Sequence, residues 1–301
     1  MVKNGVILCP VDFFPVSQHA AQYAIRLAKR DNAKLILLHV IEPIGPRLPG
    51  VRDGGLVTRA IKKTATERLQ ELMNQSKAVQ VPVTALVRVG DVVSVIRSIV
   101  AKNHVDLVVM GTHGRSRIAR LLMGSTTLRV LRELRVPVLT IHNVNVNPAR
   151  RIRHILVITD LLRGSAEAVA HAAGIATEYG AGLTLLHVFH DVQDAISGVY
   201  RLPLIKGIRS QLKEMIPPEA RNTCSINVRI LRGRPRRRVL PWIEREKVDL
   251  VVMNIHEKTL MDWLMFGSFA GQIISESPVP VMSIPAATAS RVRRQRLKKA
   301  A

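Results

Sequence analysis

The sequence predicts an α/β protein made of two tandem domains, each with an open parallel sheet that carries helices on both faces. Two observations lead to this prediction. Short apolar runs, typical of buried parallel strands, alternate with longer segments of helical periodicity along the chain. The pattern of the first half then returns in the second half. A length of 301 residues suits two domains of ordinary size.

The repeat is visible in matching peptides. Ile7–Asp12 is paralleled by Ile155–Asp160, and Asp106–Met110 reappears unchanged as Asp249–Met253. In the same way Leu37–Val40, Gly124-Ser125 and Val136–Val138 return as Leu185–Val188, Gly267-Ser268 and Val279–Val281. A period this long indicates two whole domains rather than a solenoid. We therefore expect domains over 1–147 and 148–285 and a basic tail over 286–301, with the polar stretch 143–149 at the junction.

The elements of the first repeat follow from its periodicity. Alanine and leucine recur at helical spacing within Val16–Asp31, whereas Glu42–Gly55 is rich in Pro and Gly and predicts a loop. Parallel strands joined by helices require right-handed crossovers. We expect strands over Gly5–Val11, Leu35–Ile41, Val81–Val89, Asp106–Met110 and Val136–Ile141, and helices over Val16–Asp31, Leu56–Lys77, Asp91–Asn103 and Gly124–Leu134.

A glycine-bearing loop after the fourth strand is the most informative motif. Gly111-Thr-His-Gly114 is followed, nine residues later, by Gly124-Ser125-Thr126 at the expected start of a helix. Glycines let a backbone approach a phosphate closely, and a helix N-terminus offers free N–H groups and positive potential. A tight turn with an N-cap is the alternative, but the full spacing favours a phosphate site. Ligands of such sheets bind beyond the strands' carboxyl ends, where Asp12 and Gly111 should meet.

These motifs together resemble the universal stress protein family, and the two-copy layout resembles its tandem members. The residues that carry the resemblance are Pro10–Ser17, Leu38-His-Val40 and the Gly111–Ser125 loop, and it extends over roughly 3–142 and 152–285. The family implies a five-stranded sheet of order 3-2-1-4-5, like that of the adenine nucleotide alpha-hydrolases, with ATP bound in its nucleotide-binding branch.

The resemblance also implies a role for each site residue. Asp12 would bond the ribose or adenine side, although it could also serve only as a turn or cap residue. Backbone at Val40 would read the adenine edge. The ribose would be lined by Met110 and Gly111, and the phosphates, with Mg²⁺, would be held by Gly114, Gly124, Ser125 and Thr126.

The second copy departs from this pattern. Asn254 replaces Gly111 and Glu257 replaces Gly114, while the spacing to Gly267-Ser268 is kept. A carboxylate near the phosphates would repel them. We expect the second domain to keep the fold without this ligand, or with a different one, and Asp160 to be structural there.

The residues do not indicate a dedicated enzyme, although slow ATP hydrolysis is left open. No placed nucleophile, base or metal cluster is evident. His113, Arg115, Arg117 and Arg120 either clamp phosphates or form a solvated basic segment. His39 and His187 recur at equivalent positions, which favours a packing or hydrogen-bonding role. Cys9 and Cys224 are expected to be buried, reduced thiols of a cytoplasmic protein without a transmembrane segment.

The formal net charge of +23 favours contact with polyanions such as RNA, DNA or an acidic membrane surface. Clusters occur at Arg232–Arg238, at Arg129, Arg132 and Arg135, and in the tail at Arg291–Lys299. Aromatic residues make up only 3% of the chain, which argues against base-specific RNA recognition. The sequence therefore leaves two alternative functions: an ATP-binding stress regulator, or a basic scaffold that binds nucleic acid or another polyanion.

The last strands of the two repeats carry the same Val-Pro-Val sequence. In the order 3-2-1-4-5 they are edge strands, which need to be covered. By similarity to the family's dimers, we expect the two domains to pack around a pseudo-twofold axis through Val136–Ile141 and Val279–Ile284, so that one chain imitates a dimer. Pairing of whole chains into a homodimer is left open.

Overall fold

The computed structural model describes residues 1–43, 54–78, 80–112, 123–162, 164–189, 198–255 and 269–285. Contacts between residues divide the chain into two compact units, Val2–Ala149 and Arg150 onward, with Met1 grouped in the latter. We call them the first and second domain and describe each by itself.

The first domain alternates strands and helices from one end to the other. Its elements are β1 (Val6–Pro10), α1 (Pro15–Asp31), β2 (Lys34–Ile41), α2 (Gly54–Ala78), β3 (Val83–Val89), α3 (Val92–Lys102), β4 (Leu107–Gly111), α4 (Ser125–Glu133) and β5 (Val138–Ile141). All five strands and four helices that the sequence predicts are present. Helix α4 is shorter at its C-terminal end than expected, because Leu134 has extended backbone angles, so that Arg135 lies outside it.

The second domain repeats this order. Its elements are β6 (His154–Ile158), α5 (Ser165–Tyr179), β7 (Gly182–Phe189), α6 (Gly198–Glu214), the 3-10 turn η1 (Pro218–Ala220), β8 (Ile226–Arg232), α7 (Pro235–Arg245), β9 (Leu250–Ile255), α9 (Phe269–Glu276) and β10 (Val281–Pro285).

Each domain has the predicted parallel sheet. The strand order is β3-β2-β1-β4-β5 in the first domain and β8-β7-β6-β9-β10, in the same sense, in the second. Neighbouring strands within each domain pair in parallel. The fold and the order 3-2-1-4-5 are thus confirmed. How the two domains pack on one another stays a prediction.

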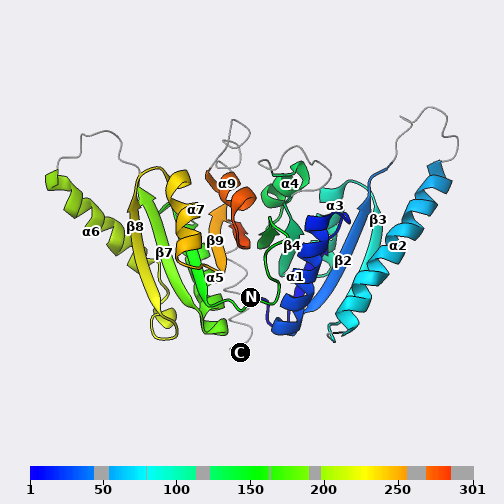
Figure 1. Cartoon of the computed structure of the whole chain (residues 1–301), viewed down its shortest axis with the longest axis horizontal. Helices are drawn as coiled ribbons and strands as arrows, with labels where there is room; N and C mark the ends of the chain where they lie inside the picture. The colour runs from blue at the N-terminus through cyan, green and yellow to red at the C-terminus, as the bar shows by residue number, and fades with distance from the viewer. Residues whose placement is uncertain are drawn as a thin grey trace. The chain divides into compact units, whose positions relative to one another are not determined.

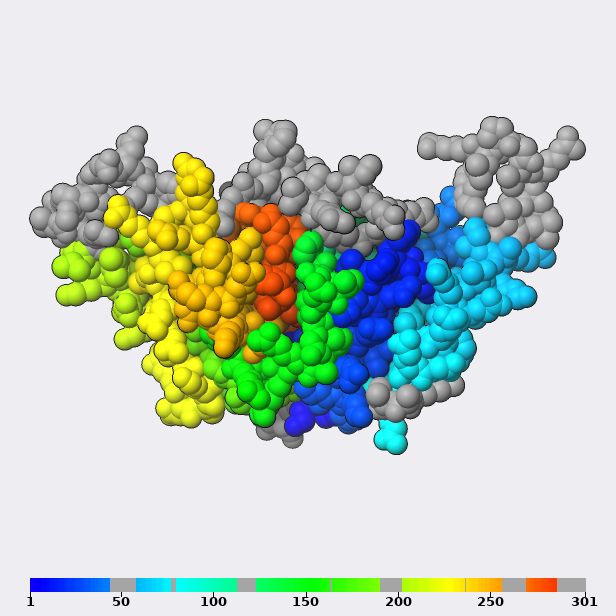
Figure 2. Space-filling view, in the orientation of Figure 1, coloured from blue at the N-terminus to red at the C-terminus, as the bar shows by residue number. Residues whose placement is uncertain are grey.

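Helices cover both faces of each sheet (Figure 1). In the first domain α1 contacts β1, β4 and α2, while α3 and α4 pack together elsewhere on the sheet. In the second domain α7 and α9 form the corresponding pair and lie side by side (Figure 2). This arrangement leaves the carboxyl ends of the central strands bordered by helix N-termini, which is where ligands of such sheets bind.

The cores consist of aliphatic side chains from the central strands. Leu8, Leu37 and Leu139 have no exposed surface in the first domain, and neither do Leu156 and Leu185 in the second. Burial of each such side chain stabilises the fold by roughly 1.5–3 kcal/mol. Cores of this kind explain how a chain with few aromatics folds.

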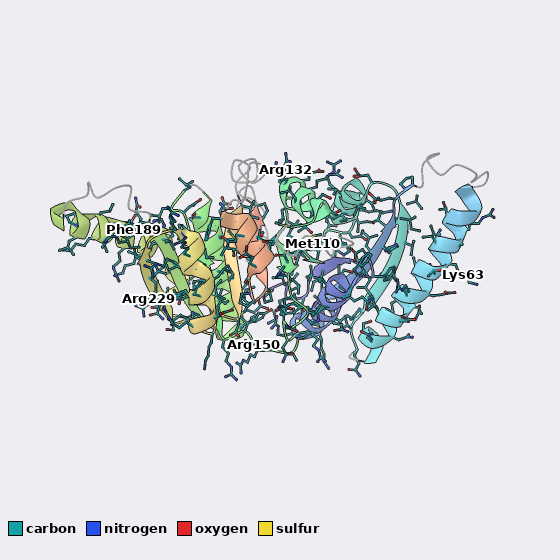
Figure 3. All side chains as sticks on the ribbon, turned by 45° about the horizontal axis from the view of Figure 1, so that its top comes forward. Lys63, Met110, Arg132, Arg150, Phe189 and Arg229 are labelled. Carbon is teal, nitrogen blue, oxygen red and sulfur yellow. The ribbon has the colours of Figure 1, made fainter. Side chains whose placement is uncertain are left out.

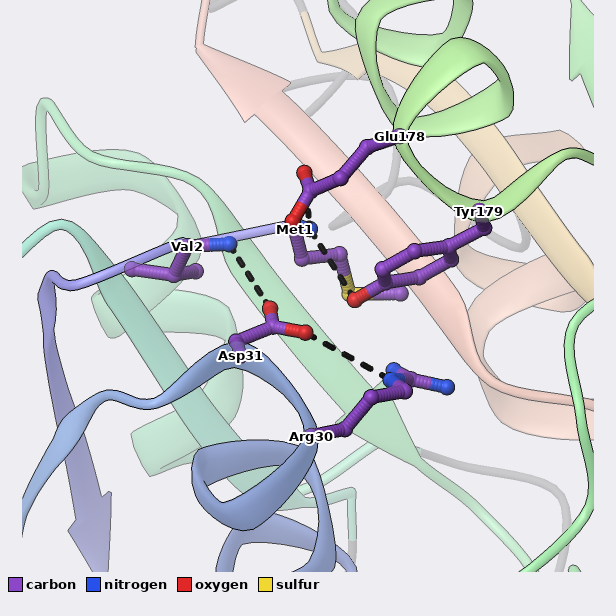
Figure 4. Close-up of polar contacts among 6 residues, drawn as sticks. All are labelled: Met1, Val2, Arg30, Asp31, Glu178 and Tyr179. Carbon is purple, nitrogen blue, oxygen red and sulfur yellow. Dashed lines mark hydrogen bonds and ion pairs between the residues drawn. The ribbon is translucent and has the colours of Figure 1, made fainter.

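The start of the first domain is fixed by a buried carboxylate. Asp31, the last residue of α1, accepts a hydrogen bond from Val2 N at 2.8 Å and contacts Arg30 Nε at 3.4 Å (Figure 4). The side chain of Asp31 is buried, and a buried carboxylate requires such partners. These contacts tie the residues before β1 to the far end of α1.

Both cysteines are free thiols, as expected. Cys9 is fully buried on β1, and its burial raises the pKa of the thiol far above the usual range. Cys224 is partly exposed, so the expectation of a buried thiol is wrong for this residue. None of the helices in the described residues combines the length and the apolar character that crossing a bilayer requires.

Folding of the second domain should depend on pH through His171. Desolvation of this side chain on α5 lowers its pKa from 6.5 to about 4. Because the folded-state pKa lies below the unfolded one, the stability contributed by neutral His171 is complete above pH 6.5 and is lost as the pH falls toward 4. At pH 4.5 the loss should be on the order of 2 kcal/mol.

Tryptophan fluorescence during urea unfolding measures this effect, because both tryptophans, Trp242 and Trp263, belong to the second domain. We expect His171→Gln to flatten the decline in stability between pH 7 and pH 4.5. Equal declines in the variant and the original protein would assign the pH dependence to other groups.

Candidate functional site

Three strand ends and one helix start meet at the carboxyl edge of the first-domain sheet. Strands β1, β2 and β4 end at Pro10, Ile41 and Gly111, and β1 pairs with both of the others. Thr112, which follows β4, accepts a hydrogen bond from Gly124 N at 2.9 Å through its carbonyl oxygen. This bond brings the start of α4 to the end of β4.

Asp12 lies in the turn between β1 and α1 with its carboxylate exposed. Its Oδ1 accepts hydrogen bonds from Phe14 N, at 3.0 Å, and from the Ser17 hydroxyl. Phe13, between them, has a positive φ of 65°. The turn role that the sequence left open for Asp12 is therefore present. Among the described residues, all its side-chain hydrogen bonds use Oδ1.

The second domain has the same turn. Asp160 Oδ1 accepts from Leu162 N at 3.0 Å and from Ser165 Oγ at 2.7 Å. Leu161 has the same positive φ as Phe13. The aspartate thus builds the strand–helix turn in both domains, whatever else it binds.

Main-chain groups of Val40 face a position that β1 does not fill. Leu38 O accepts Val11 N on the β1 side, and Ile41 O accepts Gly90 N on the β3 side. Because main-chain groups alternate along a strand, those of Val40 point to the β1 side. The pairing of β1 with β2 ends at Pro10 and Leu38, so Val40 lies beyond it.

A short stack of rings lies next to this edge. Phe13 and His39 have ring centroids 4.5 Å apart, and the guanidinium carbon of Arg68 is 5.0 Å from the Phe13 centroid. His39 Nδ1 lies 2.7 Å from Val11 O, and because a carbonyl oxygen only accepts, Nδ1 carries the hydrogen. His187 makes the equivalent bond to Thr159 O at 2.8 Å. The structure gives both histidines the expected hydrogen-bonding role.

Met110 and Gly111 end β4. Met110 is buried (Figure 3). A Cβ on Gly111 would lie 3.0 Å from Val16 Cγ1 and 3.2 Å from Ser17 N. Any side chain there would push Val16 and the main chain of α1 away by a few tenths of an ångström, so the glycine permits the close approach of α1. The sequence motif had suggested another reason for this glycine, namely the close approach of the main chain to a phosphate.

The start of α4 carries the predicted phosphate-binding groups. Gly124 is its N-cap and supplies no side chain, and Ser125 and Thr126 stand in the first turn. No described residue accepts a hydrogen bond from the main-chain N–H of Ser125, Thr126 or Thr127. Thr127 Oγ1 donates to Gly111 O at 3.2 Å and holds the helix start against β4.

Part of the predicted site lies outside the described residues. This applies to His113, Gly114, Arg115, Arg117 and Arg120 in the first domain. In the second domain it applies to Glu257, Gly267 and Ser268. The structure therefore brings together Asp12, Val40, Met110, Gly111, Gly124, Ser125 and Thr126 and does not place the rest.

The corresponding edge of the second domain holds a pocket of about 170 Å³. Asp160, Val188, Met253 and Asn254 line it, at the positions of Asp12, Val40, Met110 and Gly111. Sequence reasoning missed this pocket, because it treated the second copy chiefly by its lost glycines.

One further feature, the pairing of Arg129 with Asp91, was not predicted. Arg129 is not a free basic residue: its guanidinium makes two hydrogen bonds to Asp91, at 2.9 and 3.1 Å. Arg129 holds the pKa of Asp91 well below its usual range. Asp91 also caps α3 by accepting from Ser94 N. The pairing joins residues far apart in the chain, and no local motif announces it.

No three His, Cys, Asp or Glu side chains within the described ranges are grouped so as to hold a metal ion. What the edge of the first domain offers chemically is main-chain donors and acceptors, two hydroxyls and one carboxylate. Such groups bind a polar ligand and orient it.

Comparisons with known proteins agree with this geometry. The sequence model of the Universal stress protein family matches residues 3–142 and 151–285. A universal stress protein of Mycolicibacterium smegmatis is 26% identical over 289 residues, covering 92% of this chain and 96% of that protein. One from Methanocaldococcus jannaschii is 29% identical over 148 residues, covering 47% and 86%. The crystal structure of a universal stress protein from Archaeoglobus fulgidus has a TM-score of 0.71 at 21% identity, covering 94% and 97%, which shows the shared fold.

Proposed function

The chain belongs to the universal stress protein family, and from this premise we propose that it is an ATP-binding regulatory protein of a stress response. ATP is held in the first domain only. The observation that carries the proposal is the meeting of Asp12, the Val40 main chain and the N-terminus of α4 at one edge of the sheet.

The start of α4 supports the phosphate end of the site. The N–H groups of Ser125, Thr126 and Thr127 have no acceptor among the described residues, and a helix N-terminus favours anions. The hydroxyls of Ser125 and Thr126 add donors at the same place. Phosphate bound there would accept hydrogen bonds from groups that have no acceptor among the described residues.

The ends of β1 and β2 support the nucleoside end. Val40 presents an N–H and a C=O side by side beyond the end of β1, and an adenine edge offers the complementary acceptor and donor. Asp12 presents an exposed carboxylate, the usual partner of ribose hydroxyls in related nucleotide-binding folds. Met110 and Gly111 lie between these groups and α4.

Binding of ATP rather than its chemical conversion is the proposed activity. The described residues offer no base or nucleophile at the start of α4, and Mg²⁺ would arrive on the phosphates and meet the hydroxyls of Ser125 and Thr126. Occupancy of the site would then alter the binding of a partner. A cytoplasmic location and pairing of whole chains stay predictions.

Calorimetry should find one ATP per chain. Asp12→Asn should weaken the binding of ATP by about 1.5–3 kcal/mol, because a hydrogen bond from the ligand to a charged group is lost. Asparagine keeps Oδ1 as acceptor for Phe14 N, so the turn stays intact. Asp160→Asn is the matched control and should leave ATP affinity unchanged. Two ATP molecules per chain, or equal losses in both variants, would contradict the assignment to the first domain.

The second candidate function is polyanion binding. Exposed basic residues occur on both domains, among them Lys63 on α2, Arg132 on α4 and Arg229 on β8 (Figure 3). Arg129 is exposed as well, but its charge is already paired with that of Asp91.

If this charge is functional, duplex DNA or RNA should bind with an affinity that falls steeply with salt, and removal of residues 290–301 should reduce the slope of that dependence. Fluorescence anisotropy from about 50 to 200 mM salt measures it. Negligible binding at the lowest salt would leave the charge without a polyanion role.

A further inference from the structure

Arginines are concentrated at the outer edge of the second domain. Between positions 229 and 238 the sequence holds six arginines and neither a lysine nor an acidic residue. One of them is on β8 (Figure 3), and others belong to the turn that follows β8 and to the start of α7. We call the exposed residues Arg229, Arg234, Arg237 and Arg238 the arginine face.

The arginine face lies on the side of the sheet that α7 covers. The chain steps outward from β7 through α6 to β8, and α7 then leads back inward to β9. Right-handed crossovers therefore place α6 and α7 on opposite sides of the sheet. Helix α6 contacts β8, where half-buried Val228 and Ile230 flank the exposed Arg229. Because side chains alternate along a strand, Arg229 points to the side of α7.

The turn between β8 and α7 is fixed by hydrogen bonds. Gly233 has a positive φ of 122°, and its N–H donates to Phe189 O at 3.0 Å. Arg238 Nε donates to Arg232 O at 3.1 Å, and a Cβ on Gly233 would lie 3.2 Å from that nitrogen. Strand, turn and helix thus hold the arginine face on one preformed backbone, which lowers the ordering cost of binding.

The first domain builds the same strand, turn and helix without this charge. Gly90 follows β3 with a positive φ of 150°, as Gly233 follows β8. The matching stretch 86–95 contains one arginine and one aspartate and has no net charge, whereas 229–238 carries six positive charges. The fold therefore does not require the arginines.

The arginines also take the place of a favourable helix cap. In the first domain Asp91 caps α3 by accepting a hydrogen bond from Ser94 N, and it pairs with Arg129. Arg234 and Arg237 stand at the positions of Asp91 and Ser94, and α7 has no side-chain cap. Cations at a helix N-terminus are unfavourable by themselves. A bound polyanion would offset this cost, which favours a binding role for the arginines over a structural one.

The charge of the arginine face is not neutralised within the part of the chain that the structure describes. No described carboxylate forms an ion pair with any of its four members. Glu244 and Glu246 lie at the other end of α7, and Glu246 pairs with Arg245. We propose that the arginine face binds the phosphate backbone of a nucleic acid duplex. The inference rests on the second candidate function, polyanion binding, and assigns that function to one surface.

The kind and spacing of the side chains suit phosphates. A planar guanidinium binds two phosphate oxygens at once, which the ammonium of lysine does not. Arg229 precedes Gly233 by four residues, or about 13 Å along the strand. Charges follow one another at about 3.4 Å along each strand of a duplex. The arginine face therefore reaches several phosphates at the same time.

Two other polyanions fit less well. Binding to a membrane surface adds apolar side chains that enter the lipid. The exposed leucines of the second domain nearest in sequence, Leu202 and Leu204, belong to α6 on the opposite side of the sheet. Single-stranded nucleic acid is bound by stacking of its bases on aromatic rings. Trp242 of α7 is buried and offers no such ring.

The test is fluorescence anisotropy of a labelled DNA duplex, and of an RNA duplex of the same sequence, with the full chain at about 50 to 200 mM salt. Each lost phosphate contact lowers the slope of log affinity against log salt by about 0.9. In the triple variant Arg229→Gln/Arg234→Gln/Arg237→Gln we expect the slope to fall by about 2–3 and the affinity at about 100 mM salt to fall at least about tenfold. Such a loss for either duplex supports the proposal and identifies the nucleic acid.

Two further variants serve as controls. Three exposed lysines of the first domain supply an equal loss of charge, and the slope should stay nearly unchanged in Lys34→Gln/Lys62→Gln/Lys102→Gln. The exchange Arg234→Asp/Arg237→Ser copies the helix cap of the first domain, so α7 should stay folded. It should nevertheless weaken duplex binding, while the fluorescence of the buried Trp242 keeps its native form.

The outcomes separate this inference from the function on which it rests. Equal losses in the triple variant and in the lysine control would show that only net charge matters and would overturn the inference. Duplex binding that the triple variant leaves unchanged would also overturn it, but polyanion binding by another part of the chain would stand. Absence of duplex binding by the original protein would refute both. Arginine-dependent binding of phosphatidylserine vesicles without duplex binding would replace the nucleic acid by a membrane surface.

Discussion

Replacing Gly114 with glutamate should abolish ATP binding by the folded chain. The change copies Glu257 of the second domain into the first. Two like charges about 4 Å apart repel by about 4 kcal/mol at the effective dielectric constant of a protein surface, and a triphosphate carries several charges. We expect the ATP affinity to fall by at least about a thousandfold, measured by calorimetry, while far-ultraviolet circular dichroism keeps its native form.

A matched pair separates charge from bulk. Gly114→Gln has nearly the size of Gly114→Glu without the charge, so it should retain part of the affinity. Raising the salt concentration screens charge repulsion, so it should restore more ATP affinity to the glutamate variant than to the glutamine variant. Unchanged ATP binding by the folded Gly114→Glu protein would show that this position lies away from the phosphates and would remove the reason for restricting ATP to one domain.

The sequence predicted the fold well because the fold depends on local patterns. Apolar runs and helical periodicity identify the strands and helices of the first domain, and the repeated peptides transfer them to the second. The residues at which helices and strands end were predicted less well than the presence of the helices and strands. The predicted helix at 124–134 ends at Glu133, since Leu134 turns to extended angles and leads into β5. Termini depend on caps and on tertiary contacts, which periodicity does not encode.

The site was predicted only in part, and the reason is again physical. Asp12, Val40 and the start of α4 could be expected together, because parallel strands bring their carboxyl ends to one edge. The ion pair of Arg129 with Asp91 and the ring stack of Phe13 on His39 join residues that are distant in sequence. Neither leaves a local signal. The pocket of the second domain was missed because a lost glycine motif was given more weight than the retained Asp160 and Val188.

Gly111 gives the clearest case of a motif residue whose structural reason differs from the expected one. Its missing Cβ faces Val16 Cγ1 and Ser17 N at 3.0 and 3.2 Å. In the second domain Asn254 takes the place of Gly111, and Gly164 takes the place of Val16. A larger residue on the strand is thus matched by a smaller one at the start of the helix. Gly164 also has a positive φ of 94°, which by itself favours glycine. The evidence for a packing pair is therefore the 3.0 Å approach of Val16 Cγ1 to the Cβ position of Gly111.

Gly111→Asn should therefore destabilise the first domain by about 3 kcal/mol, because the new side chain meets the main chain of α1 as well as Val16. Both tryptophans lie in the second domain, so circular dichroism should show an earlier transition while the tryptophan transition stays in place. Adding Val16→Gly makes room, so Gly111→Asn should cost about 1 kcal/mol less in that background. The rescue is partial, since Ser17 N remains at 3.2 Å from the Cβ position. Additive effects of the two changes would show that Val16 and Gly111 do not form a packing pair.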